Sequence, residues 1–70
     1  MSTYLLTKRP VSRGPERYRK SFNDPVEAAK AYVREVNRPD ILESVTDRLR
    51  SAEVGEGTAS ILGVQVWRFT

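Results

Sequence analysis

Two prolines bracket the segment that most restricts how this chain can fold. In NDPVEAAKAYVREVNRP, Asp24 can accept from the first free amides of a helix, and Pro25 fits the first helical position, where its missing N–H needs no partner. Pro39 prevents continuation, and Asn37 is expected to end the helix. The segment therefore predicts an amphipathic helix over residues 24–36, with an apolar stripe made by Val26, Ala29, Val33 and Val36 beside Tyr32.

Residues 40–52 allow two interpretations. At about 3.6 residues per turn the apolar side chains fall within an arc of about 100°, and Asp40 with Glu43 repeats a capping spacing, so periodicity favours a helix capped by Asp40. The run ILESVT is also typical of a short strand, because Ile, Val and Thr prefer a pleated surface. Helix and strand both remain open for this segment on sequence alone.

Both ends of the chain have the composition of antiparallel hairpins. Residues 3–8 (TYLLTK) and 17–22 (RYRKSF) are typical of strands, with Tyr18 and Phe22 expected to face inward, and the Pro- and Gly-marked loop RPVSRGPE joins them. The C-terminal run TASILGVQVWRFT predicts strand, turn and strand, with the bend at residues 62–63 because glycine accepts the backbone geometry of a tight turn.

The last strand has two faces of different composition. By alternation they are Gln65, Trp67 and Phe69 on one side and Val64, Val66 and Arg68 on the other. We expect Trp67 and Phe69 to fill the core, because a chain of 70 residues has few other large apolar side chains. The alternative is that Trp67 is exposed and, with Arg68 nearby, anchors a protein partner.

Together these elements predict a small α+β domain spanning residues 1–70. An antiparallel sheet of three to five strands, supplied by the two hairpins, would pack against one or two helices. The longest apolar runs are too short to span a bilayer, and the first residues lack the pattern of a secretory signal. Because the chain has no cysteine, its composition fits a reducing compartment, and we expect a cytoplasmic protein.

Positive charge is concentrated in the first third of the chain. Residues 1–22 hold six basic residues and one acid, a net charge of +5, whereas residues 23–70 hold six basic and eight acidic residues. The excess lies in KRPVSRGPERYRK, where Arg outnumbers Lys and can form paired hydrogen bonds to carboxylate or phosphate. Such asymmetry indicates an electrostatic contact with a partner, although charged loops also keep small domains in solution and protect edge strands.

The composition offers little for catalysis. The chain has no cysteine and no histidine, and it contains no nucleotide-binding, hydrolase or zinc-protease motif. The closely spaced acids Asp40, Glu43 and Asp47 are typical of a helix cap and a hydrated helix face rather than of an active site. We therefore expect no enzymatic activity, no cofactor and no metal site.

The leading hypothesis is a non-catalytic binding module that docks its basic hairpin on a larger acidic protein or nucleoprotein, as a monomer or a homodimer. In size and outline the chain resembles the compact inhibitors and modulators that phages and mobile elements encode, including anti-CRISPR proteins, and no residue motif carries this resemblance. The alternative is direct, largely non-specific binding of DNA or RNA through phosphate contacts. The candidate contact residues are Lys8, Arg9, Arg13, Arg17, Tyr18, Arg19 and Lys20 in the hairpin and Trp67 with Arg68 in the last strand.

Overall fold

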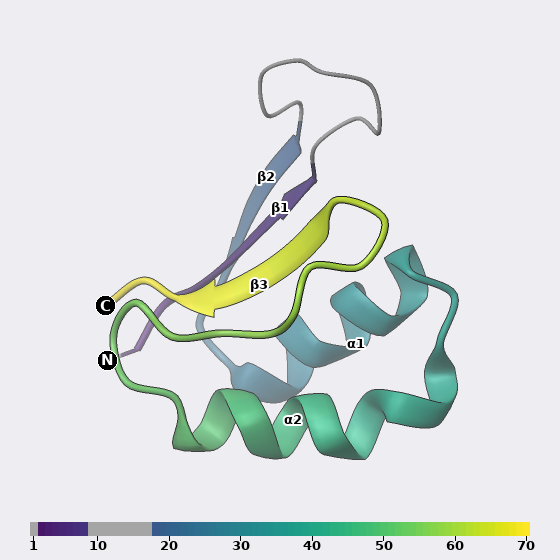
Figure 1. The fold of residues 1–70 in the computed structure, drawn as a ribbon. Helices are drawn as coiled ribbons and strands as arrows, with labels where there is room; N and C mark the ends of the chain where they lie inside the picture. The colour runs from purple at the N-terminus through teal and green to yellow at the C-terminus, as the bar shows by residue number, and fades with distance from the viewer. Residues whose placement is uncertain (1, 9–17) are drawn as a thin grey trace.

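The computed structural model describes residues 2–8 and 18–70, and it confirms the α+β architecture (Figure 1). Within these ranges a three-stranded antiparallel sheet packs against α1, and α1 in turn packs against α2. The elements are β1 (Tyr4–Lys8), β2 (Tyr18–Phe22), α1 (Pro25–Glu35), the short 3-10 helix η1 (Pro39–Ile41), α2 (Leu42–Ser51) and β3 (Val64–Arg68).

β1 is the central strand of the sheet. The strand order is β2-β1-β3, and β1 pairs antiparallel with both neighbours. Leu6 lies opposite Lys20 on one side and opposite Val66 on the other. The register also places Tyr4 opposite Arg68, and the two ends of the described chain consequently lie close together in Figure 1.

The outer edge of β3 is covered by residues 55–58, which we call the edge segment. The Arg68 carbonyl accepts from the Gly55 amide over 2.8 Å, and the Val66 carbonyl accepts from the Thr58 amide over 2.8 Å. The Thr58 hydroxyl in turn accepts from the Val66 amide over 3.1 Å. β3 therefore has hydrogen-bonding partners on both sides, although the edge segment is not a regular strand.

The predicted C-terminal hairpin is present chiefly as its turn. Ile61 and Val64 exchange backbone hydrogen bonds of 3.0 and 2.8 Å around Leu62 and Gly63. Leu62 has a φ of 52° and Gly63 a φ of 79°, as a type I′ turn requires at both central positions. The arm before the turn makes isolated bridges at Gly57 and Ile61 instead of the predicted strand.

The core lies between the sheet and the helices, and its composition differs from the one that the sequence predicted. Val66 is fully buried there, whereas Phe69 is 57% exposed and Trp67 is half-buried outside the core cluster, so the prediction that these two aromatics fill the core is wrong. Tyr32 of α1 and Leu49 of α2, 1% and 0% exposed, already occupy the interior. Small valines on β3 complete the packing against them, which turns the alternate residues of the strand away.

Local signals set both ends of α1 as predicted. Asp24 caps the helix, because its Oδ1 accepts from the Val26 amide over 2.9 Å. At the other end Asn37 adopts a φ of 56°, which lets the Arg38 amide donate to the Val33 carbonyl over 2.9 Å in a Schellman turn. This turn directs the chain back toward α2.

Residues 42–51 form α2, so the helical interpretation of this segment is confirmed. The expected capping by Asp40 is wrong, since α2 begins after Ile41 without a side-chain capping bond. Asp40 lies in η1, where its two carboxylate oxygens accept from Nε and Nη2 of Arg38, each over 3.1 Å. The planar guanidinium two residues away competes successfully for the carboxylate, because it satisfies both oxygens at once.

Side chains from both helices hold the segment that precedes β3. The Tyr32 hydroxyl donates to the Ala59 carbonyl over 2.7 Å, and Nε of Arg48 donates to the Gly57 carbonyl over 3.0 Å. The edge segment is thus fixed from the helix side as well as from β3.

Gly57 should be among the most sensitive positions of the fold. A Cβ at Gly57 would overlap the Val66 carbonyl oxygen and lie 2.5 Å from the Trp67 Cα, so Gly57→Ala must push the edge segment off β3. We expect a loss of about 3 kcal/mol in the free energy of unfolding, measured by urea denaturation. The control is Gly55→Ala, where φ is +92° but nothing lies within 4 Å, and which should lose only about 1 kcal/mol. Equal losses at both positions would contradict the close packing at Gly57.

Leu62 should be replaceable with a gain in stability. It combines a φ of 52° with an exposure of 67%. Leucine is strained in this backbone conformation, and removing its exposed side chain costs little packing energy. Leu62→Asn should raise the melting temperature by about 4 °C, because asparagine tolerates this conformation. Val54→Asn is the matched control, since Val54 is 61% exposed and is not among the residues with positive φ. An equal rise in both variants would show that the gain comes from replacing an exposed apolar side chain by a polar one, not from the backbone conformation at Leu62.

Candidate interaction surface

The predicted basic hairpin is described at its two strands. Arg9, Arg13 and Arg17 lie outside the described residues, and Tyr18 and Arg19 are described through their backbone in β2. The two lysines can be placed individually.

Lys8 and Lys20 have different surroundings. Lys8 ends β1, and its Nζ lies 3.1 Å from Oε2 of Glu35 on α1, so part of its charge is neutralised within the fold. Lys20 lies in the middle of β2 with an exposed side chain, and its Nζ is 5.3 Å from the centre of the Phe22 ring. Phe22 packs partly against the core, as the sequence predicted. The Lys20 ammonium lies over the Phe22 ring at the edge of the core and remains accessible to solvent.

Trp67 lies on the sheet face that points away from α1. It is directly opposite Leu5 in the register, and Leu5 is 8% exposed although it does not belong to the core cluster. Because directly opposite residues share a face and are neighbours, the register places Trp67 beside Leu5 on the far side of the sheet. The structure thus favours the alternative that places Trp67 outside the core.

Arg68 is not part of this apolar face. Alternation places it on the helix side of β3, where its Nη1 donates to the Ala52 carbonyl over 3.0 Å and its Nε to the Thr70 carbonyl over 3.1 Å. A cation bonded to a carbonyl at the end of α2 also complements the helix dipole. Arg68 therefore ties β3 to α2, and the structure does not bring it together with Trp67.

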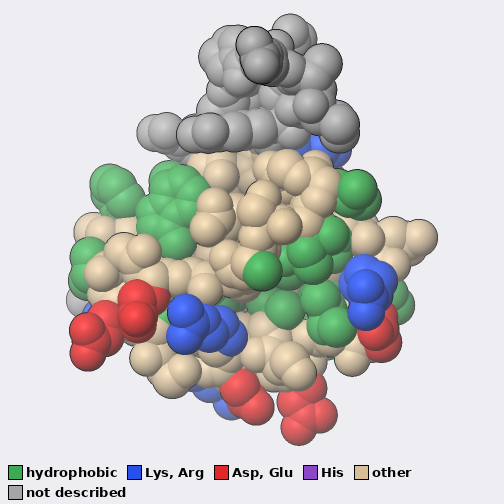
Figure 2. All heavy atoms as spheres, in the orientation of Figure 1, with side chains coloured by type: hydrophobic (Ala, Val, Ile, Leu, Met, Phe, Trp, Pro, Cys, Tyr) green, Lys and Arg blue, Asp and Glu red, His purple; other side chains and the backbone are tan. Residues whose placement is uncertain are grey.

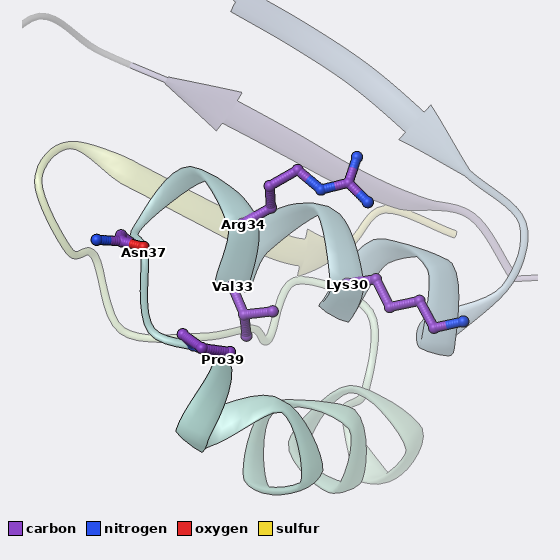
Figure 3. A pocket seen from close by; sticks show the side chains of 5 residues that line it. All are labelled: Lys30, Val33, Arg34, Asn37 and Pro39. Carbon is purple, nitrogen blue, oxygen red and sulfur yellow. The ribbon is translucent and has the colours of Figure 1, made fainter.

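A hollow of about 340 Å³ was not foreseen from the sequence. It is lined by Lys30, Val33, Arg34, Asn37 and Pro39, and it forms where the chain reverses between α1 and η1 (Figure 3). The spacing of Lys30 and Arg34 on one helix face was visible in the sequence, but the reversal that completes the hollow was not. In Figure 3 the two cationic side chains extend in different directions, so they do not converge on one point.

The acidic residues lie chiefly on the helix side of the molecule. In Figure 2 the acidic side chains of the visible face lie over the helices and the chain that follows α2. The hydrogen bonds from Arg38 lower the pKa of Asp40, so this carboxylate stays ionised and is a poor proton donor near neutrality. Among residues 2–8 and 18–70, no three or more acids gather in a way that could hold a metal ion.

Comparison with protein-family models, with curated proteins and with solved structures gave no match to this chain. No helix in the described part of the chain is both long enough and apolar enough to cross a membrane.

The placement of Trp67 can be tested by fluorescence, since it is the single tryptophan of the chain. Half-burial on the sheet face away from α1 should give an emission maximum between those of buried and fully hydrated indole, with clear quenching by acrylamide in the native state. Val66→Ala, at a fully buried position, should lower the free energy of unfolding by about 2 kcal/mol without changing that native quenching. A blue-shifted and unquenched emission would instead place Trp67 in the core.

Proposed function

We propose that this protein is a non-catalytic binding module that docks its basic β1–β2 hairpin on an acidic surface of a larger protein or nucleoprotein. The observation that supports it most directly is the charge distribution, with a net +5 over residues 1–22 and an acidic excess over the rest of the chain. Opposite potentials of this kind raise association rates and orient the encounter. An inhibitor or modulator of the kind encoded by phages and mobile elements would use such a surface.

The described residues favour a protein surface over a nucleic acid. Asp24 and Glu27 begin α1 directly after β2 and are exposed, so negative charge borders the basic strand. A phosphate backbone that continued past the end of β2 would meet these acids, whereas an acidic surface no longer than β2 would not. The Arg-rich composition suits carboxylates equally well, because the guanidinium fork matches both anions.

The test compares two variants that each remove three positive charges. The hairpin variant replaces Arg13, Arg17 and Arg19 by Ala, and the helix variant replaces Lys30, Arg34 and Arg50 by Ala. Immobilised wild type and both variants are used to capture partners from a host-cell extract treated with nuclease. If the hairpin carries the contact, its variant should lose a specific partner by about tenfold or more, and the helix variant should retain it.

Two outcomes would count against the proposal. If the hairpin variant recovers the same partner at equal strength, the hairpin is not the docking surface. If purified protein binds duplex or single-stranded oligonucleotides with an affinity that falls steeply with salt, and nuclease abolishes protein capture, direct nucleic-acid binding replaces it.

A further inference from the structure

The two edges of the described sheet differ in whether another segment is hydrogen-bonded to them. At one edge β3 is bonded to the edge segment. At the other edge lies β2, and no segment within residues 2–8 and 18–70 pairs with its outer side. An uncovered strand edge presents backbone donors and acceptors at regular spacing, which another extended chain can extend into a larger sheet.

The hydrogen-bond alternation shows which groups of β2 point outward. The Phe69 amide donates to the Thr3 carbonyl over 2.7 Å, and these residues are opposite in the register, so the odd-numbered residues of β1 bond toward β3. The even-numbered residues of β1 therefore bond toward β2, where their partners are also even-numbered. Arg19 and Ser21 are left with their N–H and C=O groups on the outer edge.

The charge of β2 selects the occupant of this edge. The strand reads YRKSF, with two basic residues and no acid, and the Lys20 side chain is exposed. A second copy pairing antiparallel through β2 would bring the Arg19–Lys20 pairs of both copies close together, and like charges on facing strands are destabilising. An extended segment that carries Asp or Glu would meet the same positions with opposite charge.

We propose that the outer edge of β2 accepts an extended, acidic segment of the docking partner as an added strand. This inference rests on the proposed docking function and specifies how the partner is held. The backbones of Arg19 and Ser21 supply two donors and two acceptors to the incoming strand. Acidic side chains of that strand lie beside Lys20, and so the edge supplies both backbone hydrogen bonds and a preference for negative charge.

The test uses two synthetic peptides of equal charge and of about six residues, a typical strand length. Both have capped ends; one alternates Glu with Val, and the other alternates Glu with Pro, which cannot donate to a sheet. Binding to the wild-type protein is measured by fluorescence anisotropy of labelled peptide. The Glu–Val peptide should bind at least about tenfold more tightly than the Glu–Pro peptide, because only the former can complete the ladder.

A variant of the protein provides the complementary measurement. Ser21→Pro removes an outward N–H, which no β1 residue uses, and proline is tolerated at such edge positions. This substitution should weaken the binding of the Glu–Val peptide by about tenfold. Ser21→Ala keeps the amide and should bind like the wild type. In the wild type, hydrogen exchange at the amides of Arg19 and Ser21 should slow on adding the Glu–Val peptide, a readout that does not depend on either variant folding.

The possible outcomes separate the two proposals. Equal binding of both peptides, or binding without protection of Arg19 and Ser21, would overturn strand addition while leaving charge-driven docking intact. No peptide binding, together with partner capture that still requires the hairpin arginines, would have the same meaning. No peptide binding with capture unaffected by those arginines would remove both proposals. A dimer in solution that Ser21→Pro dissociates would show that a second copy occupies the edge.

Discussion

The fold depends on the double pairing of β1. This strand of five residues is buried on both faces, since Leu6 points toward α1 while Leu5 and Thr7, on the opposite face, are 8% and 5% exposed. One neighbour, β2, follows it within the N-terminal third of the chain, whereas the other, β3, lies near the C-terminus, so the sheet is complete only when the C-terminal strand has returned to the N-terminal one. Such distant pairing costs chain entropy, which the core contacts of Tyr32 and Leu49 must offset.

Central placement of β1 leaves the sheet with two edges that need different solutions. β3 receives the edge segment, whose close approach is possible because Gly57 has no Cβ. β2 instead carries basic residues, and repeated positive charge discourages pairing between copies of the same strand. The same charge leaves an opposite-charged strand as a permitted neighbour, so one property of β2 both limits self-association and favours a particular class of partner.

Local interactions were predictable from the sequence, whereas choices between faces were not. The cap at Asp24, the exit at Asn37 and the turn at Leu62–Gly63 depend on a few adjacent residues, and all three were recognised. Alternation correctly divided β3 into two faces, but which face is interior depends on α1 and α2, far away in the chain. The Asp40 cap was lost to Arg38, a competition between two local partners that spacing alone does not rank.

The candidate site shows the same division. Composition located the basic hairpin, but two contacts with residues distant in the sequence reduce how much of the predicted charge faces outward. Lys8 is paired with Glu35, and Arg68 is bonded to the carbonyl of Ala52, so both contribute to packing within the fold. Lys20 has no such carboxylate or carbonyl contact among the described residues, and it shares a strand with the outward backbone groups of Ser21. An exposed charge and outward backbone groups that no other described residue pairs with therefore coincide on β2, and this coincidence follows from the central position of β1 rather than from any motif in the sequence.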